Sequence, residues 1–362
     1  MLPRFYYHPC MLGYDFGPRH PLKPERLRRT IELLEALGQT EFLDPGLDAR
    51  DDVLRVHDLE YVEAVALIGS GMAPSQGFES KFGFGSLDNP SFPGVYEASL
   101  AYSAGSAAAA RDVRDGAPLA FNISGGLHHA HRNKASGFCV FDDPAIALHI
   151  LRERFDRVAY VDIDLHHGDG VQWMFYDDPK VLTCSIHQEG SRFFPGTGWV
   201  EECGPVFTSV NAPLQSGTTG DVWLEAFERI VMDALGRFQP QAIVLQMGTD
   251  AHEYDPLGGL RLAAQEWLVA VERIRDFGVP IVAVGGGGYC LTTVPRMWVA
   301  ACLTLAGLDV PQRVPEPLGS RWGMPRFFDE DLPEPRESGT VYAHRTTEQY
   351  LNSVAEFIPN PH

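Results

Sequence analysis

The sequence has few cysteines, no long apolar run and a shortage of positive charge. The six cysteines include no CxxC pair, which excludes a disulfide framework and favours reduced thiols in the cytoplasm. No stretch approaches the ~20 apolar residues of a membrane span, and the first residues lack the apolar run of a signal peptide. The 29 Lys and Arg residues are outnumbered by 48 Asp and Glu residues, for a net charge of −19. This charge argues against nucleic-acid binding and favours a cationic substrate or a basic peptide.

The composition is that of an ordinary globular protein. Hydrophobic residues make up 44% and charged residues 21% of the 362 residues, enough apolar material for a core. The 36 glycines and 27 prolines predict many turns and long loops. No repeat or Ser/Gly-rich linker divides the chain, and the stretch 315–337, rich in proline and acids, is predicted to be a surface loop. We therefore predict one domain over residues 1–362.

Short apolar runs rich in β-branched residues alternate with segments of helical periodicity. The runs are 158–164, 181–186, 242–247 and 280–284, with a possible fifth at 118–123. Helices are predicted over 221–238, with Asp221 as the N-cap, and over 263–277. This alternation predicts an α/β fold with a parallel central sheet covered by helices on both faces. Ligands of such sheets bind beyond the carboxyl ends of the strands.

Polar side chains gather where the first of these runs ends. Asp162, Asp164 and His166 follow one another at alternate positions, so their side chains are expected on the same face. Three polar groups at the end of an apolar strand are costly without compensation. A divalent cation supplies it, and carboxylate with imidazole suits zinc, iron or manganese. A metal-free Asp–His hydrogen-bond network is the alternative.

Two further strand ends carry residues of the same chemical kind. Asp250 follows the run 242–247; alone it would be interpreted as a helix N-cap, but beside the first cluster it is a candidate third ligand. Three protein ligands leave a coordination position open, as in catalytic zinc sites. The adjacent His128 and His129 lie in a glycine-rich loop after 118–123, where they could be solvated loop residues or a general base and acid.

The last candidate segment is GGGGY at 285–289. Its glycines let the backbone approach a site closely, but it does not meet the GxGxxG spacing of a dinucleotide fold. Tyr289 could donate a hydrogen bond to an oxyanion, or pack against the loop.

Taken in order, these segments resemble the histone deacetylase superfamily, which has the arginase–deacetylase fold. The compact form is similar to the class-I-like bacterial deacetylases of acetoin utilisation. The matching segments are HPLKPER (20–26), HDLEYV (57–62), GGLHHAHRNKASGFC (125–139), VDIDLHHGDGVQ (161–172), SIHQ (185–188), FFPGTG (193–198), LQMGTD (245–250) and GGGGY (285–289). The resemblance ends near residue 307, and residues 308–362 are predicted to be a packed extension or loop.

The resemblance implies a role for each matching residue. Zn²⁺ or Fe²⁺ would be bound by Asp164, His166 and Asp250. A structural K⁺ would be bound by Asp162, Asp164, His166, Ser185 and Ile186, with a second monovalent site near Phe175. The catalytic residues would be His129 paired with Asp169 as general base and then acid, His128 paired with Asp162 as its electrostatic partner, and Tyr289 as oxyanion donor. Arg26 would be a buried arginine below the site.

The resemblance also implies a tunnel for an acylated lysine. Its substrate-binding residues would be Asp88 at the rim, then Gly137, Phe138, Phe194 and Leu257. We therefore predict a zinc-dependent amidohydrolase that removes acetyl or other acyl groups from the lysine ε-amino group of proteins or peptides. An acyl-CoA synthetase is one candidate partner, and the oligomeric state is open.

Four alternatives use the same residues differently. The first is an acetylpolyamine amidohydrolase, but Leu257 stands where polyamine-selective relatives have a glutamate. An arginase-like ureohydrolase would need two manganese ions, and the sequence offers one Asp-x-His set with Asp250. A module that binds acetylated ligands without hydrolysis, and a storage or structural metal site, are disfavoured because every catalytic position is present.

Overall fold

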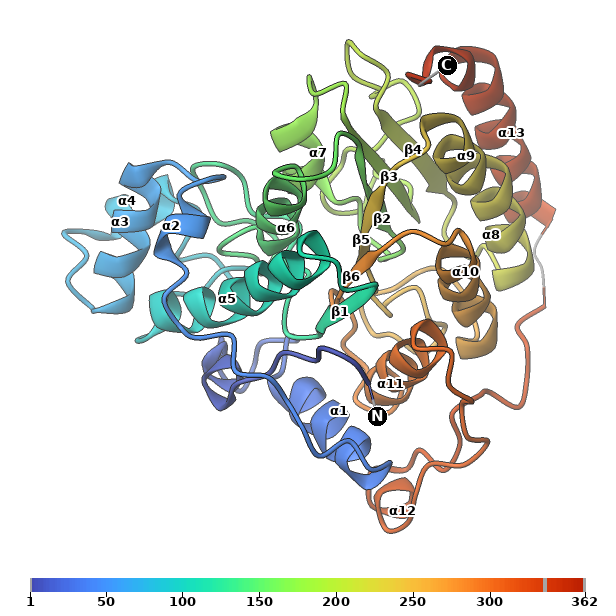
Figure 1. Ribbon diagram of the computed structural model, residues 1–362. Coiled ribbons are helices and arrows are strands. Elements are labelled where there is room, and N and C mark those ends of the chain that lie inside the picture. The colour runs from blue at the N-terminus through green and yellow to red at the C-terminus, as the bar shows by residue number, and fades with distance from the viewer. Residues whose placement is uncertain (1, 335–336, 361–362) are drawn as a thin grey trace.

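The structure is a computed structural model that describes residues 2–334 and 337–360. Within these ranges, six strands form one parallel sheet in the order β1-β6-β5-β2-β3-β4 (Figure 1). The strands are β1 (Leu119–Asn122), β2 (Val158–Asp162), β3 (Val181–Gln188), β4 (Ser209–Leu214), β5 (Ala242–Gln246) and β6 (Ile281–Val284). The prediction of a parallel sheet flanked by helices is confirmed. The sequence analysis missed β4, whose apolar run is broken by Asn211 and Pro213.

Helices cover both faces of the sheet (Figure 1). They are α1 (Glu25–Ala36), α2 (Arg50–Val53), α3 (Leu59–Gly69), α4 (Gln76–Lys81), α5 (Val95–Arg114), α6 (Asp143–Leu151), α7 (Asp169–Phe175), α8 (Gly220–Ala226), α9 (Asp233–Phe238), α10 (Ala264–Asp276), α11 (Val294–Leu305), α12 (Leu318–Trp322) and α13 (Glu337–Ser353). Short 3-10 helices are η1 (Pro9–Gly13) and η3 (Ala355–Phe357), and the π-helical segment η2 (Phe227–Met232) joins α8 to α9. Among the described residues, no helix has both the length and the apolar character needed to cross a bilayer.

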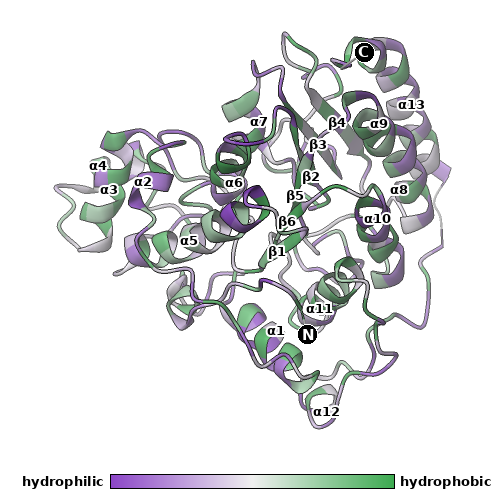
Figure 2. Cartoon of the chain, in the orientation of Figure 1, coloured by the Kyte–Doolittle hydropathy of each residue, from purple (hydrophilic) through white to green (hydrophobic). Residues whose placement is uncertain are grey.

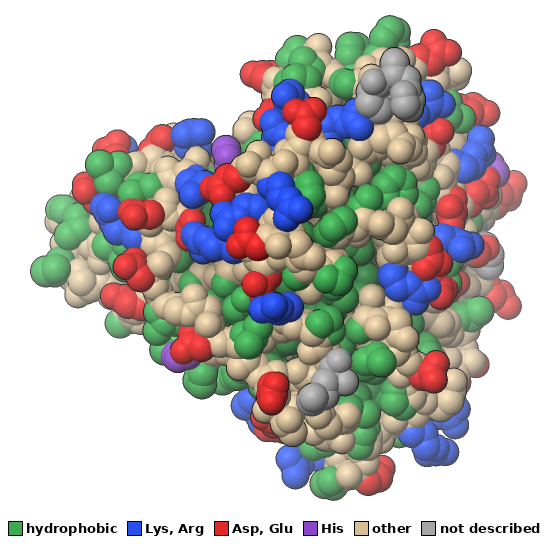
Figure 3. Space-filling model, in the orientation of Figure 1, with side chains coloured by type: hydrophobic (Ala, Val, Ile, Leu, Met, Phe, Trp, Pro, Cys, Tyr) green, Lys and Arg blue, Asp and Glu red, His purple; other side chains and the backbone are tan. Residues whose placement is uncertain are grey.

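Alternate strand residues enter two apolar cores. Ala159 and Val161 of β2 pack with residues of α1, α8, α10 and α11, whereas Val158 and Tyr160 pack with residues of α3, α5 and α6. Figure 2 shows the strands as largely hydrophobic and the helices as mixed, because each helix buries one side against the sheet. On the outer face seen in Figure 3, basic and acidic side chains are interspersed in spite of the net charge of −19.

Two local predictions were wrong. Asp221 is not the N-cap of its helix: Thr219 occupies that position, and its hydroxyl donates to the Asp221 carboxylate at 2.6 Å. The stretch 315–337 is not simply surface loop. Residues 335 and 336 lie outside the described ranges, but the rest contains α12 and buries Trp322, Met324 and Phe327 against the core. Apolar residues spaced among the prolines and acids were the missed signal.

Candidate active site

Three ligand-type side chains meet at the carboxyl ends of β2 and β5. These strands are parallel neighbours, with Asp162 opposite Gln246, so the loops that follow them begin side by side. His166 Nδ1 lies 3.2 Å from Asp164 Oδ1 and 3.0 Å from Asp250 Oδ2. One ligand atom from each of the three lies within 4.8 Å of the others. The structure thus brings together the three residues that were predicted from the sequence to be metal ligands.

The chemistry of this group fits a divalent cation. Asp164 and Asp250 are fully buried, and no lysine or arginine of the described residues forms an ion pair with either. Burial and the charge of Asp164 raise the pKa of Asp250. Burial alone would lower the pKa of His166, but the two carboxylates outweigh it and raise that pKa to about 10. Two buried carboxylates around one imidazole therefore leave negative charge that a bound cation would balance.

Each histidine of the adjacent pair contacts its own carboxylate. His128 Nδ1 lies 2.7 Å from Asp162 Oδ2, and His129 Nδ1 lies 2.6 Å from Asp169 Oδ1. Burial alone would lower the pKa of His128, but the charges of Asp162 and Asp164 outweigh burial and raise the pKa to about 9. Burial, followed by the charge of His128, holds the pKa of His129 well below its usual value. The two rings therefore differ electrostatically, and a neutral His129 can accept a proton.

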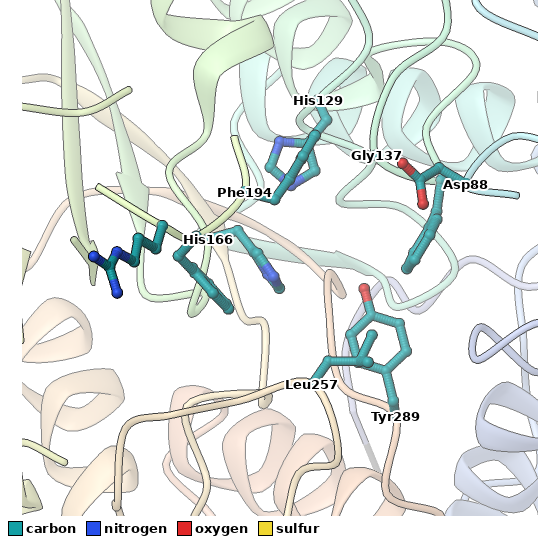
Figure 4. A pocket seen from close by; sticks show the side chains of 10 residues that line it. Asp88, His129, Gly137, His166, Phe194, Leu257 and Tyr289 are labelled. Atoms are coloured by element: carbon teal, nitrogen blue, oxygen red, sulfur yellow. The ribbon is translucent and has the colours of Figure 1, made fainter. Parts of the chain in front are cut away.

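The glycine-rich loop after β6 lies directly against the candidate ligands. Gly286 and Gly288 have φ values of 125° and 126°, in the region that favours glycine. The backbone N–H of Gly287 donates to Asp164 Oδ2 at 2.7 Å. Tyr289 follows, and its hydroxyl points into the cavity (Figure 4). Burial and the nearby Asp250 raise the pKa of Tyr289 well above its usual value, so the phenol keeps the proton that it can donate.

A cavity of about 260 Å³ leads from the surface to these groups (Figure 4). Its lining consists of Asp88, His129, Gly137, Phe138, His166, Arg192, Phe193, Phe194, Leu257 and Tyr289. Gly137 has a φ of 52°. A Cβ atom on Gly137 would lie 2.6 Å from His129 Cδ2 and 2.7 Å from Phe194 Cε1. Glycine at this position is therefore needed to keep the cavity open.

The residues predicted to bind a monovalent cation lie at the end of β2, in the loop after it and on β3, and two of them, Asp164 and His166, also belong to the Asp–His–Asp group. Asp162 and Ser185 are opposite each other in the sheet, and Ile186 is fully buried on β3. Ser185 Oγ lies 2.8 Å from His187 Nδ1. Phe175, near which a second cation was predicted, is buried and its ring centroid lies 5.1 Å from that of His149. Potassium binding itself stays a prediction.

The sequence analysis missed several residues that contact the site. Gln246 Nε2 donates to Asp164 Oδ2 at 3.1 Å, and the Tyr160 hydroxyl donates to Asp162 Oδ2 at 2.8 Å. The Phe193 ring stacks on His166 with centroids 4.9 Å apart. Tyr160 was identifiable in principle, because it lies two residues before Asp162 and so shares its face of β2. The position of Gln246 follows from strand order, which the sequence does not state.

Comparison with known proteins places this geometry in a family. The sequence profile described as "Histone deacetylase domain" matches residues 20–305. The chain belongs to the histone deacetylase family. It is 37% identical over 332 residues to the acetoin utilization protein AcuC of Bacillus subtilis, an alignment that covers 88% of this chain and 86% of AcuC. It is 35% identical over 366 residues to the histone deacetylase clr6 of Schizosaccharomyces pombe, covering 98% of this chain and 88% of clr6.

The resemblance drawn from the sequence motifs is therefore confirmed. Every residue nominated for the site, from Asp88 to Tyr289, lies within the matched range of 20–305. Membership in the histone deacetylase family makes the chain a deacetylase, which is a hydrolase. The parallel sheet with its site at the strand ends agrees with the arginase–deacetylase fold.

Proposed function

We propose that this protein is a zinc-dependent deacetylase that removes acetyl or longer acyl groups from the ε-amino group of lysine in proteins or peptides. One observation carries the proposal: His129, His166 and the Tyr289 hydroxyl line one cavity, and His166 belongs to the buried Asp164–His166–Asp250 group. A zinc or ferrous ion held by the three ligands would polarise an amide carbonyl and make a water molecule more acidic.

The side chains of the chain supply the proton transfers. His129 Nε2 would take a proton from the attacking water, since Nδ1 is occupied by Asp169, and would later give that proton to the departing amine. His128, held by Asp162, would stay as a charged neighbour. The Tyr289 hydroxyl would donate to the oxygen on which negative charge develops.

The cavity favours an extended aliphatic stem. The rings of Phe138 and Phe194 and the side chain of Leu257 line it, and apolar walls suit the methylene groups of lysine. Asp88 lies at the same cavity and would accept hydrogen bonds from the backbone of a bound peptide. Leu257 brings no negative charge to the cavity, which supports a lysine substrate over an acetylated polyamine.

The arginase-like alternative has no support in the geometry. Within residues 2–334 and 337–360, the Asp164, His166 and Asp250 group is the one cluster of three or more ligand-type residues close enough to hold a metal. His167, the adjacent histidine of the motif, contacts Thr197 and Gln172 instead. A second manganese ion would therefore lack ligands.

Four further features belong to the same proposal. We infer one deacetylase domain over residues 1–362, a cytoplasmic location and a structural potassium ion beside the zinc. The partner would be an acetylated protein, for which an acyl-CoA synthetase is a candidate. Native mass spectrometry and potassium titration of activity would test the assembly state and the ion.

A substrate panel tests the proposal directly. The purified protein is stripped with chelator, reloaded with Zn²⁺ or Fe²⁺, and offered acetyl-lysine peptides, longer acyl-lysine peptides, acetylpolyamines and arginine. We expect metal-dependent release of acetate from the lysine peptides, and none from the Asp164→Asn variant, which controls for contaminating enzymes. Hydrolysis of polyamines alone would establish the alternative substrate class. Activity that persists after metal removal would refute the mechanism.

A further inference from the structure

Asp255, which the proposed mechanism does not use, joins two segments that line the tunnel. It lies in the loop after β5 and is only 5% exposed. Its Oδ1 accepts the backbone N–H of Leu257 at 3.0 Å. Its Oδ2 accepts the N–H of Tyr289 at 2.6 Å and that of Cys290 at 3.3 Å. One carboxylate therefore contacts the backbone of both a tunnel-wall residue and the proposed oxyanion donor.

These bonds hold the C-terminal end of the glycine-rich loop, which carries the Tyr289 side chain. Arg26 holds the other side of the loop, donating to the carbonyls of Gly286 at 2.7 Å and Gly288 at 3.1 Å. Four consecutive glycines leave the backbone many accessible conformations. The position of the Tyr289 hydroxyl therefore depends on external contacts, and among the described residues Asp255 provides the bond to the backbone N–H of Tyr289 itself.

The carboxylate is also costly to keep at this position. Burial and the charge of Asp250 raise the pKa of Asp255 to about 7, and no lysine or arginine of the described chain forms an ion pair with it. Three backbone N–H donors offset this cost. A buried carboxylate without a cationic partner is better explained by what its geometry fixes than by a gain in stability.

We propose that Asp255 is a positioning residue, which sets the Tyr289 hydroxyl relative to the tunnel wall by binding the backbone of Tyr289 and Leu257 at once. Asparagine at this position has one acceptor oxygen and turns an NH₂ group toward one of the two segments, so it breaks one side of the bridge. This inference rests on the proposed hydrolysis, in which Tyr289 stabilises the oxyanion.

A double-mutant cycle between Asp255→Asn and Tyr289→Phe tests this role. A displacement of about 1 Å in a catalytic group can cost ~10²-fold, so we expect Asp255→Asn to lower kcat roughly 10- to 100-fold, to change KM by a smaller factor through Leu257 and to keep the bound metal. In the Tyr289→Phe background the same substitution is expected to change kcat less than about threefold, because the group that it displaces is already gone. Equal losses in both backgrounds, or loss of metal from Asp255→Asn, would refute a role through Tyr289.

A spectroscopic measurement decides the question without relying on activity. The protein is labelled with 3-fluorotyrosine, and the Tyr289 resonance is assigned as the one missing from Tyr289→Phe. Asp255→Asn is expected to shift or broaden this resonance. The matched control is Asp52→Asn, which removes a buried carboxylate on α2. Arg111 binds that carboxylate at 2.6 Å. This variant is expected to leave the Tyr289 resonance in place.

Each remaining outcome has a defined meaning. An unmoved Tyr289 resonance in Asp255→Asn would overturn the inference. If Asp255→Asn does not fold, Asp255→Glu keeps the charge and both acceptor oxygens but displaces them by one methylene, and it is expected to move the same resonance. A wild-type protein that hydrolyses no acyl-lysine peptide would count against the proposed function, while the fluorine spectra would still decide the position of Tyr289.

Discussion

Two buried polar clusters lie close together in this protein and are built on opposite electrostatic principles. In the metal-site cluster, Asp164 and Asp250 flank His166, and no arginine or lysine of the described residues pairs with the carboxylates. The second cluster, here called the latch cluster, consists of His252, Arg296 and Asp329. Asp329 Oδ1 lies 2.5 Å from Arg296, and Oδ2 lies 2.9 Å from His252 Nε2.

The difference separates a site from a structural contact. In the latch cluster, a permanent cation from α11 balances the carboxylate of the segment after α12, and Asp329 also accepts the N–H of Ala264 at the start of α10 at 2.8 Å. Its groups satisfy one another, so a ligand would have nothing to add. In the metal-site cluster two carboxylates share one imidazole, so the cation of the proposed function would complete the charge balance. Buried carboxylates thus indicate a binding site when their balancing charge is missing from the chain.

The largest expected effect comes from removing one carboxylate of the metal-site cluster. Asp250→Asn should lose bound metal and on the order of 10³-fold or more in kcat/KM, because metal polarisation contributes several kcal/mol. In the metal-free state, however, the variant should be at least as stable as wild type, since burial and Asp164 raise the pKa of Asp250 and disfavour its charge. Metal analysis, kinetics and denaturation with and without chelator check this. A variant that keeps its metal would remove Asp250 from the ligand set.

A second variant tests whether catalytic activity can be lost while the metal stays bound. Tyr289→Phe should lower kcat by roughly 10²- to 10³-fold, the usual loss for an oxyanion donor, because only the hydroxyl is removed. Metal content and thermal stability should match wild type, in contrast to Asp250→Asn. Near-normal turnover would exclude Tyr289 from catalysis.

Much of the metal-site cluster could be predicted from the sequence because its residues follow strands. Alternation along 158–164 places Asp162 and Asp164 on the same side, and strand ends in a parallel sheet share an edge. The meeting of Asp164 with Asp250, 86 residues away, also required β2 and β5 to be neighbours. The family resemblance implied the ligand set, whereas the order of the strands is known only from the structure.

The latch cluster and Asp255 were not predicted, for a physical reason. Arg296, Asp329 and Asp255 are isolated charged residues in helices or loops, without a local pattern to distinguish them from the many exposed charges of the chain. Their burial results from how distant segments pack. The proline-rich composition around Asp329 predicted surface loop, whereas the interspersed Trp322 and Phe327 draw that stretch onto the core.

The third prediction concerns stability, and its sign is opposite to the metal-free stability change expected for Asp250→Asn. Asp329→Asn should lower the free energy of unfolding by about 1–3 kcal/mol, somewhat less than the 3–5 kcal/mol typical of fully buried pairs, because its side chain is 14% exposed. The loss should be the same with and without metal, and the activity of the folded variant should be unchanged. Urea denaturation and the kcat of the purified variant measure the two. A variant as stable as wild type would show that the latch cluster contributes no net stability.

The smallest expected effect is the pH dependence of the stability difference between wild type and Asp329→Asn. Burial alone would raise the pKa of Asp329, but His252 and Arg296 outweigh it and hold the pKa well below its usual value. The folded carboxylate therefore binds its proton less readily than the unfolded one, whose pKa is about 3.9. Its stabilisation is complete above the unfolded pKa and is lost as the pH falls through the folded pKa. The stability gap between wild type and Asp329→Asn should stay constant from pH 7 to about 5 and shrink below about 4. The metal-site carboxylates titrate in both proteins and cancel in this difference. A gap that stays constant on acidification, measured by urea denaturation at each pH, would mean that packing rather than charge holds the latch cluster together.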